Sequence, residues 1–281
     1  MPSPTTESPM QRVPRDADGW VRLWRHADIP ILAETAAQLE ELRLREDVVD
    51  ARLIAQCVAG DPLMSLKLLV QVSTHRSSRR ITDAETATAA LVLMGIAPFF
   101  RNFGPQPTVE DHLSARPEAL RGLQAVLHRA RRAAGFALGF AVHRMDHDAE
   151  VIHEAALLHD FAEMLLWCHV PALALRIAAM QRDDPSLRSS AAQRAVLNVE
   201  LADVQQALMR AWRLPELLVR ISDDHHADSA QVRNVLLAIR LARHTAQGWD
   251  NAALPDDVRD IAALLNLGLE PTLKLLRDLD G

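Results

Sequence analysis

The stretch Ala155-Ala156-Leu157-Leu158-His159-Asp160-Phe161 sets an imidazole and a carboxylate side by side in an otherwise apolar run of good helix formers. Burying a charged carboxylate without a partner costs several kcal/mol or more. We therefore expect either a metal ion or a hydrogen-bond network to satisfy His159 and Asp160. The helical character of this stretch extends over most of the chain.

Helical signals dominate on both sides of it. Aromatic residues make up 4% of the 281 residues and Tyr does not occur, which argues against a β-sandwich. Asp61-Pro62 joins a good N-cap to a residue favoured at the first helical position. No segment shows sustained alternation of polar and apolar residues. We predict an all-α, multi-helical bundle with later helices over about 118–143, 150–167, 171–181, 189–211, 215–224, 230–247 and 256–279.

Proline and glycine positions suggest how the chain is divided. Residues 1–19 are polar and rich in Pro, so we expect a disordered N-terminal tail. One helical domain should then fill 20–281. The stretch 104–117 contains Gly104 and three prolines, and is the best candidate for an internal boundary. It separates an N-terminal helical sub-domain at about 28–103 from a second one at about 118–281.

Charge and composition limit the partners. The net charge of −6 disfavours nonspecific nucleic-acid binding. The N-terminus lacks the pattern of a signal peptide, and no apolar stretch reaches the roughly 18 residues of a membrane span. We expect a cytoplasmic protein that has no membrane contact, with Cys57 and Cys168 as buried thiols.

The chain has 12 histidines, and those beside carboxylates are candidates for a metal site. Imidazole and carboxylate donors from three separate helices can hold a divalent ion. The candidate ligands are His128, His159, Asp160, His225 and His226. The alternative is a buried His–Asp hydrogen-bonded knot that ties helices together.

Several segments, taken in order, resemble the HDOD family, which are bacterial output or regulatory domains related to HD-domain phosphohydrolases. The similarity covers about 28–245 and implies an HD-like helical fold. The segments are Ile29-Pro30-Ile31-Leu32, Gly60-Asp61-Pro62, the helix ending at Leu93-Met94-Gly95, AALLHDFAEMLL from Ala155 to Leu166, Ala211-Trp212-Arg213-Leu214-Pro215 and His225-His226.

The resemblance also implies a degenerate metal site. In catalytic relatives a first histidine, the His-Asp pair, later histidines and a final aspartate hold the metal. Here the middle histidine falls near Leu201 and the final aspartate near Arg243. Leucine cannot ligate, and arginine would repel a cation. Glu163 replaces a lysine that often follows the pair in catalytic relatives, and its charge would oppose phosphate binding.

These departures favour a non-catalytic signal-transduction domain that binds a protein partner or a small ligand. We expect it to need no cofactor and to act in trans on its partner, with a homodimer as one possible arrangement. Two alternatives stay open. One is a metal-dependent phosphohydrolase acting on a nucleotide or cyclic dinucleotide, with a divalent metal on the candidate ligands. The other is a nucleotide sensor without turnover. In each case His128, His159 and Asp160 should lie in one cleft, approached by His225 or His226.

Overall fold

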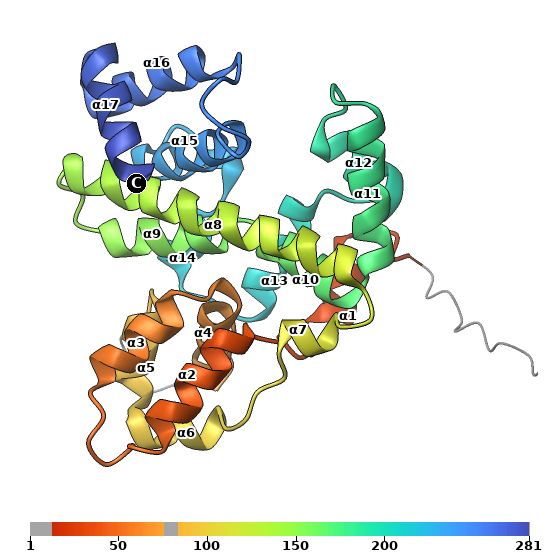
Figure 1. Ribbon diagram of the computed structural model, residues 1–281, viewed down its shortest axis with the longest axis vertical. Coiled ribbons are helices and arrows are strands. Elements are labelled where there is room, and N and C mark those ends of the chain that lie inside the picture. The colour runs from red at the N-terminus through yellow and green to blue at the C-terminus, as the bar shows by residue number, and fades with distance from the viewer. Residues whose placement is uncertain (1–12, 76–83, 281) are drawn as a thin grey trace, which may run out of the picture.

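The computed structural model describes residues 13–75 and 84–280, and these residues form helices joined by short connections (Figure 1). This confirms the all-α prediction for the described part. Within these ranges no single helix is both long enough and apolar enough to cross a membrane. In chain order the helices are α1 (Ala17–Trp24), α2 (Ala33–Arg43), α3 (Ala51–Ala59), α4 (Pro62–Thr74), α5 (Ala87–Met94), α6 (Ile96–Asn102), α7 (Val109–His112), α8 (Pro117–His143), α9 (Ala149–Leu158), α10 (Phe161–His169), α11 (Pro171–Asp183), α12 (Ser189–Leu197), α13 (Leu201–Ala211), α14 (Glu216–Ile221), the 3₁₀ turn η1 (Asp224–His226), α15 (Ala230–His244), α16 (Leu254–Leu265) and α17 (Leu269–Asp280).

The long helix α8 lies across the middle of the molecule and packs against both α9 and α15 (Figure 1). Pro117 begins it, as the residue type favoured at the first helical position predicts. Gly122 leaves room for the ring of Trp167, which lets α10 approach α8 closely. The functional site is therefore built around one long helix that α9, α10 and α15 all contact.

Helices α2 to α6 gather below α8 (Figure 1). Asp61 is fully buried and caps α4, because its Oδ1 accepts hydrogen bonds from the backbone N–H groups of Leu63 and Met64. Its Oδ2 accepts from the N–H of Leu32 at 2.8 Å. The Asp61-Pro62 helix start is thus present, and the same carboxylate also fixes the segment before α2.

The N-terminal boundary differs from the prediction. Helix α1 begins at Ala17, where Asp16 accepts a hydrogen bond from the N–H of Gly19, and Trp20 and Trp24 are buried. The predicted tail over 1–19 is therefore too long by several residues, because two buried tryptophans hold α1 in the core. Residues 1–12 lie outside the described residues. The division into two sub-domains remains a prediction.

Three predicted helices are each divided in two. The predicted helix over 189–211 breaks at Asn198 and that over 256–279 at Asn266, and both residues adopt the left-handed conformation (φ 63° and 54°) that asparagine tolerates. The helix predicted over 150–167 breaks at His159-Asp160, which separates α9 from α10. This last break lies at the candidate site.

The C-terminal end of α15 is held against α8 by side-chain hydrogen bonds. Arg132 of α8 donates to both carboxylate oxygens of Asp280, at 2.8 and 2.7 Å, and to the hydroxyl of Thr245 just after α15. Asp280 also accepts from the indole N–H of Trp249. These bonds fix the part of α15 that carries Arg243.

Candidate functional site

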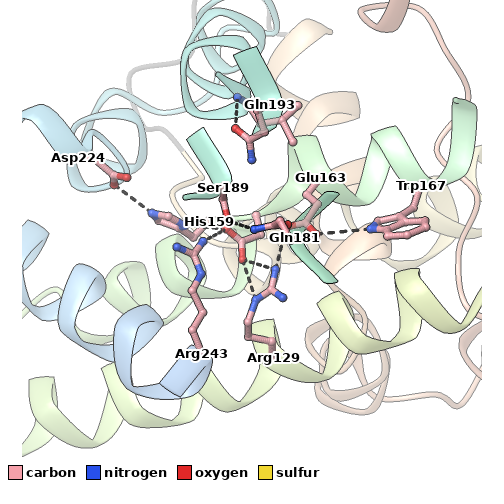
Figure 2. A network of polar contacts seen from close by, with 11 residues as sticks. Arg129, His159, Glu163, Trp167, Gln181, Ser189, Gln193, Asp224 and Arg243 are labelled. Carbon is pink, nitrogen blue, oxygen red and sulfur yellow. Dashed lines mark hydrogen bonds and ion pairs between the residues drawn. The ribbon is translucent and has the colours of Figure 1, made fainter. Parts of the chain in front are cut away.

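The break between α9 and α10 places the His-Asp pair at a helix junction. Asp160 has φ −106° and ψ 22°, outside helical values, and its carbonyl accepts from the N–H groups of Glu163 and Met164 in the first turn of α10. His159 Nδ1 and Asp160 Oδ1 are 3.0 Å apart. At this junction Asp160 is within reach of Arg129 of α8 and Arg243 of α15. Figure 2 shows these two arginines close to His159.

Asp160 is paired through both carboxylate oxygens. Arg129 of α8 donates to Oδ2 through Nε at 3.1 Å and Nη2 at 2.9 Å. Arg243 of α15 donates to Oδ1 at 2.8 Å. Burial alone would raise the pKa of Asp160, but the charges of Arg243 and Arg129 and the hydrogen bond from His159 hold it well below its usual value. The carboxylate is ionised, and each of its oxygens is paired with a guanidinium group.

His159 bridges two carboxylates. Its Nε2 lies 3.0 Å from Oδ1 of Asp224, which belongs to η1, while Nδ1 faces Asp160. Burial lowers the pKa of His159, but hydrogen bonds and charges from Asp160 and Asp224 outweigh this and raise it to about 9. The ring is therefore a cation at neutral pH that donates from both nitrogens.

Arg129 extends the network toward α10. Its Nη2 also donates to Glu163 Oε2 at 2.8 Å, and the indole N–H of Trp167 points to the other oxygen of Glu163 at 3.5 Å. Burial would lower the pKa of Arg129, and the carboxylates of Glu163 and Asp160 raise it instead. Arg129 thus cross-links α8 to both ends of the first turn of α10.

A cleft lies beside this network. Its main part has a volume of about 410 Å³ and runs between the α11–α12 pair and α15. A smaller part of about 280 Å³ lies toward η1 and shares His159, Ala202, Gln205 and Asp224 with the main part. The main part is lined by Arg129, His159, Asp160, Ala162, Glu163, Gln181, Ser189, Ser190, Gln193, Glu200, Leu201, Ala202, Gln205, Asp224, Arg243 and Ala246.

The structure brings only part of the predicted ligand set together. His159 and Asp160 line the cleft, and His225 lines its smaller part with an exposed side chain. The side chain of His226 lies outside the part of the chain that the structure describes. His128 is exposed and does not line the cleft, contrary to our expectation, since the next residue, Arg129, occupies that place.

The sequence contained a signal for this difference. Val126, Ala130 and Ala133 belong to the buried stripe of α8. Helical residues three and four positions apart share a face, so Arg129 lies on the side of the buried Val126 and Ala133, whereas Gln124 and Arg131, the corresponding neighbours of His128, are exposed. Asp224 and Gln205 were also missed, and neither has a local pattern that marks it.

These side chains do not fit a divalent metal. Both ring nitrogens of His159 already face carboxylates, and Asp160 is already paired with two arginines, so neither side chain has a free donor aimed into the cleft. Within the described ranges, no three His, Cys, Asp or Glu residues form a group that could hold a metal ion. The chemistry of the site is that of a charged hydrogen-bond network beside a polar cleft.

Fold and site together define an all-helical, HD-like protein in which arginines neutralise the aspartate of the His-Asp pair. The HDOD domain model matches residues 29–228, well over half of the 281-residue chain. The chain belongs to the HDOD family.

Solved structures share the fold. The MmoQ response regulator from Methylococcus capsulatus is 18% identical with a TM-score of 0.66, and the match covers 89% of this chain and 98% of that one. A virulence factor (cj0248) from Campylobacter jejuni is 15% identical, also with a TM-score of 0.66, over 94% of this chain and 95% of that one. The comparison with curated proteins gives no match. The predicted HD-like helical bundle is confirmed.

Proposed function

We propose that this protein is a non-catalytic signalling domain that regulates by binding a protein partner or a small ligand and does not turn it over. The observation that carries the proposal is the pairing of both Asp160 oxygens with Arg129 and Arg243. In this arrangement two guanidinium groups supply the positive charge that a metal would bring to the carboxylate.

Hydrolysis of a phosphate ester in an HD-like site would need a metal with an open position for water. Both ring nitrogens of His159 lie 3.0 Å from carboxylate oxygens, of Asp160 on one side and of Asp224 on the other, so neither nitrogen is directed at an open metal position. Glu163 also faces the cleft and adds a negative charge beside Asp160. These features oppose the metal-dependent phosphohydrolase acting on a nucleotide or cyclic dinucleotide, and they leave ligand binding intact.

A signalling role is supported by membership of the HDOD family and by the name of MmoQ, a response regulator that shares the fold. A rigid helical core with a polar cleft suits a domain that reads out a bound molecule. The partner protein, the homodimer and the cytoplasmic location expected from the sequence belong to the same proposal.

The metal content of purified protein tests this function. We expect no stoichiometric transition metal by inductively coupled plasma mass spectrometry, and no hydrolysis of cyclic dinucleotides when Mn²⁺ or Mg²⁺ is added. The double variant Arg129→His/Arg243→Asp replaces both guanidinium groups by side chains that can ligate a metal, and it should raise the metal occupancy above that of the wild type. About one metal per chain in the wild type, lost in His159→Ala/Asp160→Ala together with a hydrolytic activity, would overturn the proposal.

A further inference from the structure

Gln205 has no structural explanation within the protein. It lies on α13, lines both parts of the cleft and is only 4% exposed. Its side-chain amide makes no hydrogen bond to any described residue, whereas Gln206 beside it donates to the carbonyls of Val219 and Ser222. Buried polar groups nearly always have a partner. The amide of Gln205 is therefore available to a molecule in the cleft.

Charges of opposite sign flank this amide. Arg243 and Asp224 both line the main part of the cleft. Asp160 faces Nδ1 of His159 and Asp224 faces Nε2. Because Arg243 binds Asp160, Arg243 and Asp224 belong to opposite sides of the His159 ring. Among the described residues no ion pair joins Arg243 to Asp224. Each keeps unused groups: Nε and Nη1 of Arg243, and Oδ2 of Asp224.

Both of these side chains can be reached from the cleft, since the side chain of Arg243 is 48% exposed and that of Asp224 is 37% exposed. The cations His159, Arg129 and Arg243 are matched by as many carboxylates in the network. A ligand with a net charge would disturb this balance in a partly buried place. A ligand that carries one charge of each sign would not.

The remaining lining describes the rest of the ligand. Gln181, Ser189, Ser190 and Gln193 add uncharged polar groups from the α11–α12 side. No Phe or Trp from the described residues lines either part of the cleft, so it has no ring of that kind on which a nucleobase could stack. A volume of about 410 Å³ lies within the usual range of small-molecule sites, roughly 300–1,000 Å³.

We propose that this cleft binds a small zwitterion of the amino-acid class, with its carboxylate on Arg243, its ammonium group on Asp224 and a polar group on the amide of Gln205. The inference rests on the proposed function, because the ligand is bound and left unchanged. It names the class of small ligand that the non-catalytic domain reads out.

Isothermal titration calorimetry with the individual free L-amino acids tests the proposal. At least one should bind the wild-type protein. Its amide, which lacks the carboxylate, and its N-acetyl form, which lacks the ammonium group, should each bind about tenfold or more weakly, because each loses a hydrogen-bonded charge pair. This series uses only the wild-type chain and does not depend on how any variant folds.

Two variants locate the site. Gln205→Met keeps the side-chain volume and should weaken binding about tenfold. Asp224→Asn keeps an oxygen for His159 and should remove the preference for the free amino group over its N-acetyl form. Asp228→Asn, an exposed carboxylate in the same connection but outside the cleft lining, is the matched control and should bind like the wild type.

Two results would overturn the inference: no amino acid binds the wild type at millimolar concentration, or the amide and N-acetyl forms bind as tightly as the free zwitterion. Neither result touches the non-catalytic function, which fails only if metal-dependent hydrolysis is found. The two proposals can therefore be refuted separately.

Discussion

Replacing Asp160 by Asn should destabilise the protein strongly. The carboxylate is 8% exposed and accepts hydrogen bonds from Arg129 and Arg243. The substitution keeps the shape but removes the negative charge that holds these guanidinium groups next to a protonated His159. Removing one partner from a buried ion pair costs about 3–5 kcal/mol, because the charges left behind are desolvated and unpaired.

Arg243→Met is the matched comparison. The side chain of Arg243 is 48% exposed, and Asp160 keeps Arg129 and His159 when Arg243 is lost. A pair exposed to this degree contributes about 0.2–1 kcal/mol. The free energy of unfolding should therefore fall several times less for Arg243→Met than for Asp160→Asn.

Urea unfolding followed by circular dichroism measures both effects as a shift of the midpoint at an unchanged slope. The reasoning is refuted if Asp160→Asn costs less than about 1 kcal/mol, since a buried charge pair cannot be lost so cheaply. It is also refuted if a chelator brings the wild type down to the stability of Asp160→Asn, because a metal would then neutralise the carboxylate.

Further changes test other parts of the structure. The pKa of His159 is raised from 6.5 to about 9, so its contribution to stability is complete below about pH 6.5 and is lost as the pH rises through 9; His159→Ala should abolish this decline in urea titrations. Burial raises the pKa of Glu154 from 4.5 to about 7, so the folded state favours the neutral acid and stability falls as the pH rises from 4.5 to 7. Glu154→Gln should therefore be the more stable protein above pH 7, by up to about 3 kcal/mol, and equal melting temperatures there would contradict the raised pKa. Gly122→Ala drives a Cβ into the ring of Trp167 and should lower the free energy of unfolding by about 1–3 kcal/mol. Gly135→Ala is the control, because its Cβ meets no atom within 4 Å, and it should raise the free energy of unfolding by about 0.5–1 kcal/mol. Similar shifts of the denaturation midpoint for both variants would refute the close packing of α10 on α8.

Local chemistry explains which parts of the fold could be predicted. The starts of α4 and α8 depend on Asp61-Pro62 and Pro117, and these residues act within one helical turn. The breaks at Asn198 and Asn266 were missed because asparagine permits the left-handed conformation without requiring it. Tertiary packing decides whether such a residue ends a helix.

The site was predicted in part for the same reason. His159 and Asp160 are adjacent in sequence, so their apolar surroundings predicted a buried and satisfied pair. Their partners come from far along the chain: Arg129 is 31 residues from Asp160 and Arg243 is 83 residues away. The sequence indicated that Arg243 opposes a metal, but the ion pair that it forms with Asp160 depends on how α15 packs against α8.

The origin of Arg243 has a consequence for how such a site can change. The match to the HDOD domain model ends at residue 228, and α15 begins at Ala230. One of the two cations that neutralise Asp160 is therefore supplied by a segment beyond the matched part, while Arg129 lies within it. Because α15 packs against α8 and α9 within the same core, the rest of that segment is tied to the matched scaffold, whereas the partly exposed Arg243 can be exchanged by itself. A single substitution at residue 243 would therefore change the charge that faces Asp160 without disturbing the packing of the helices.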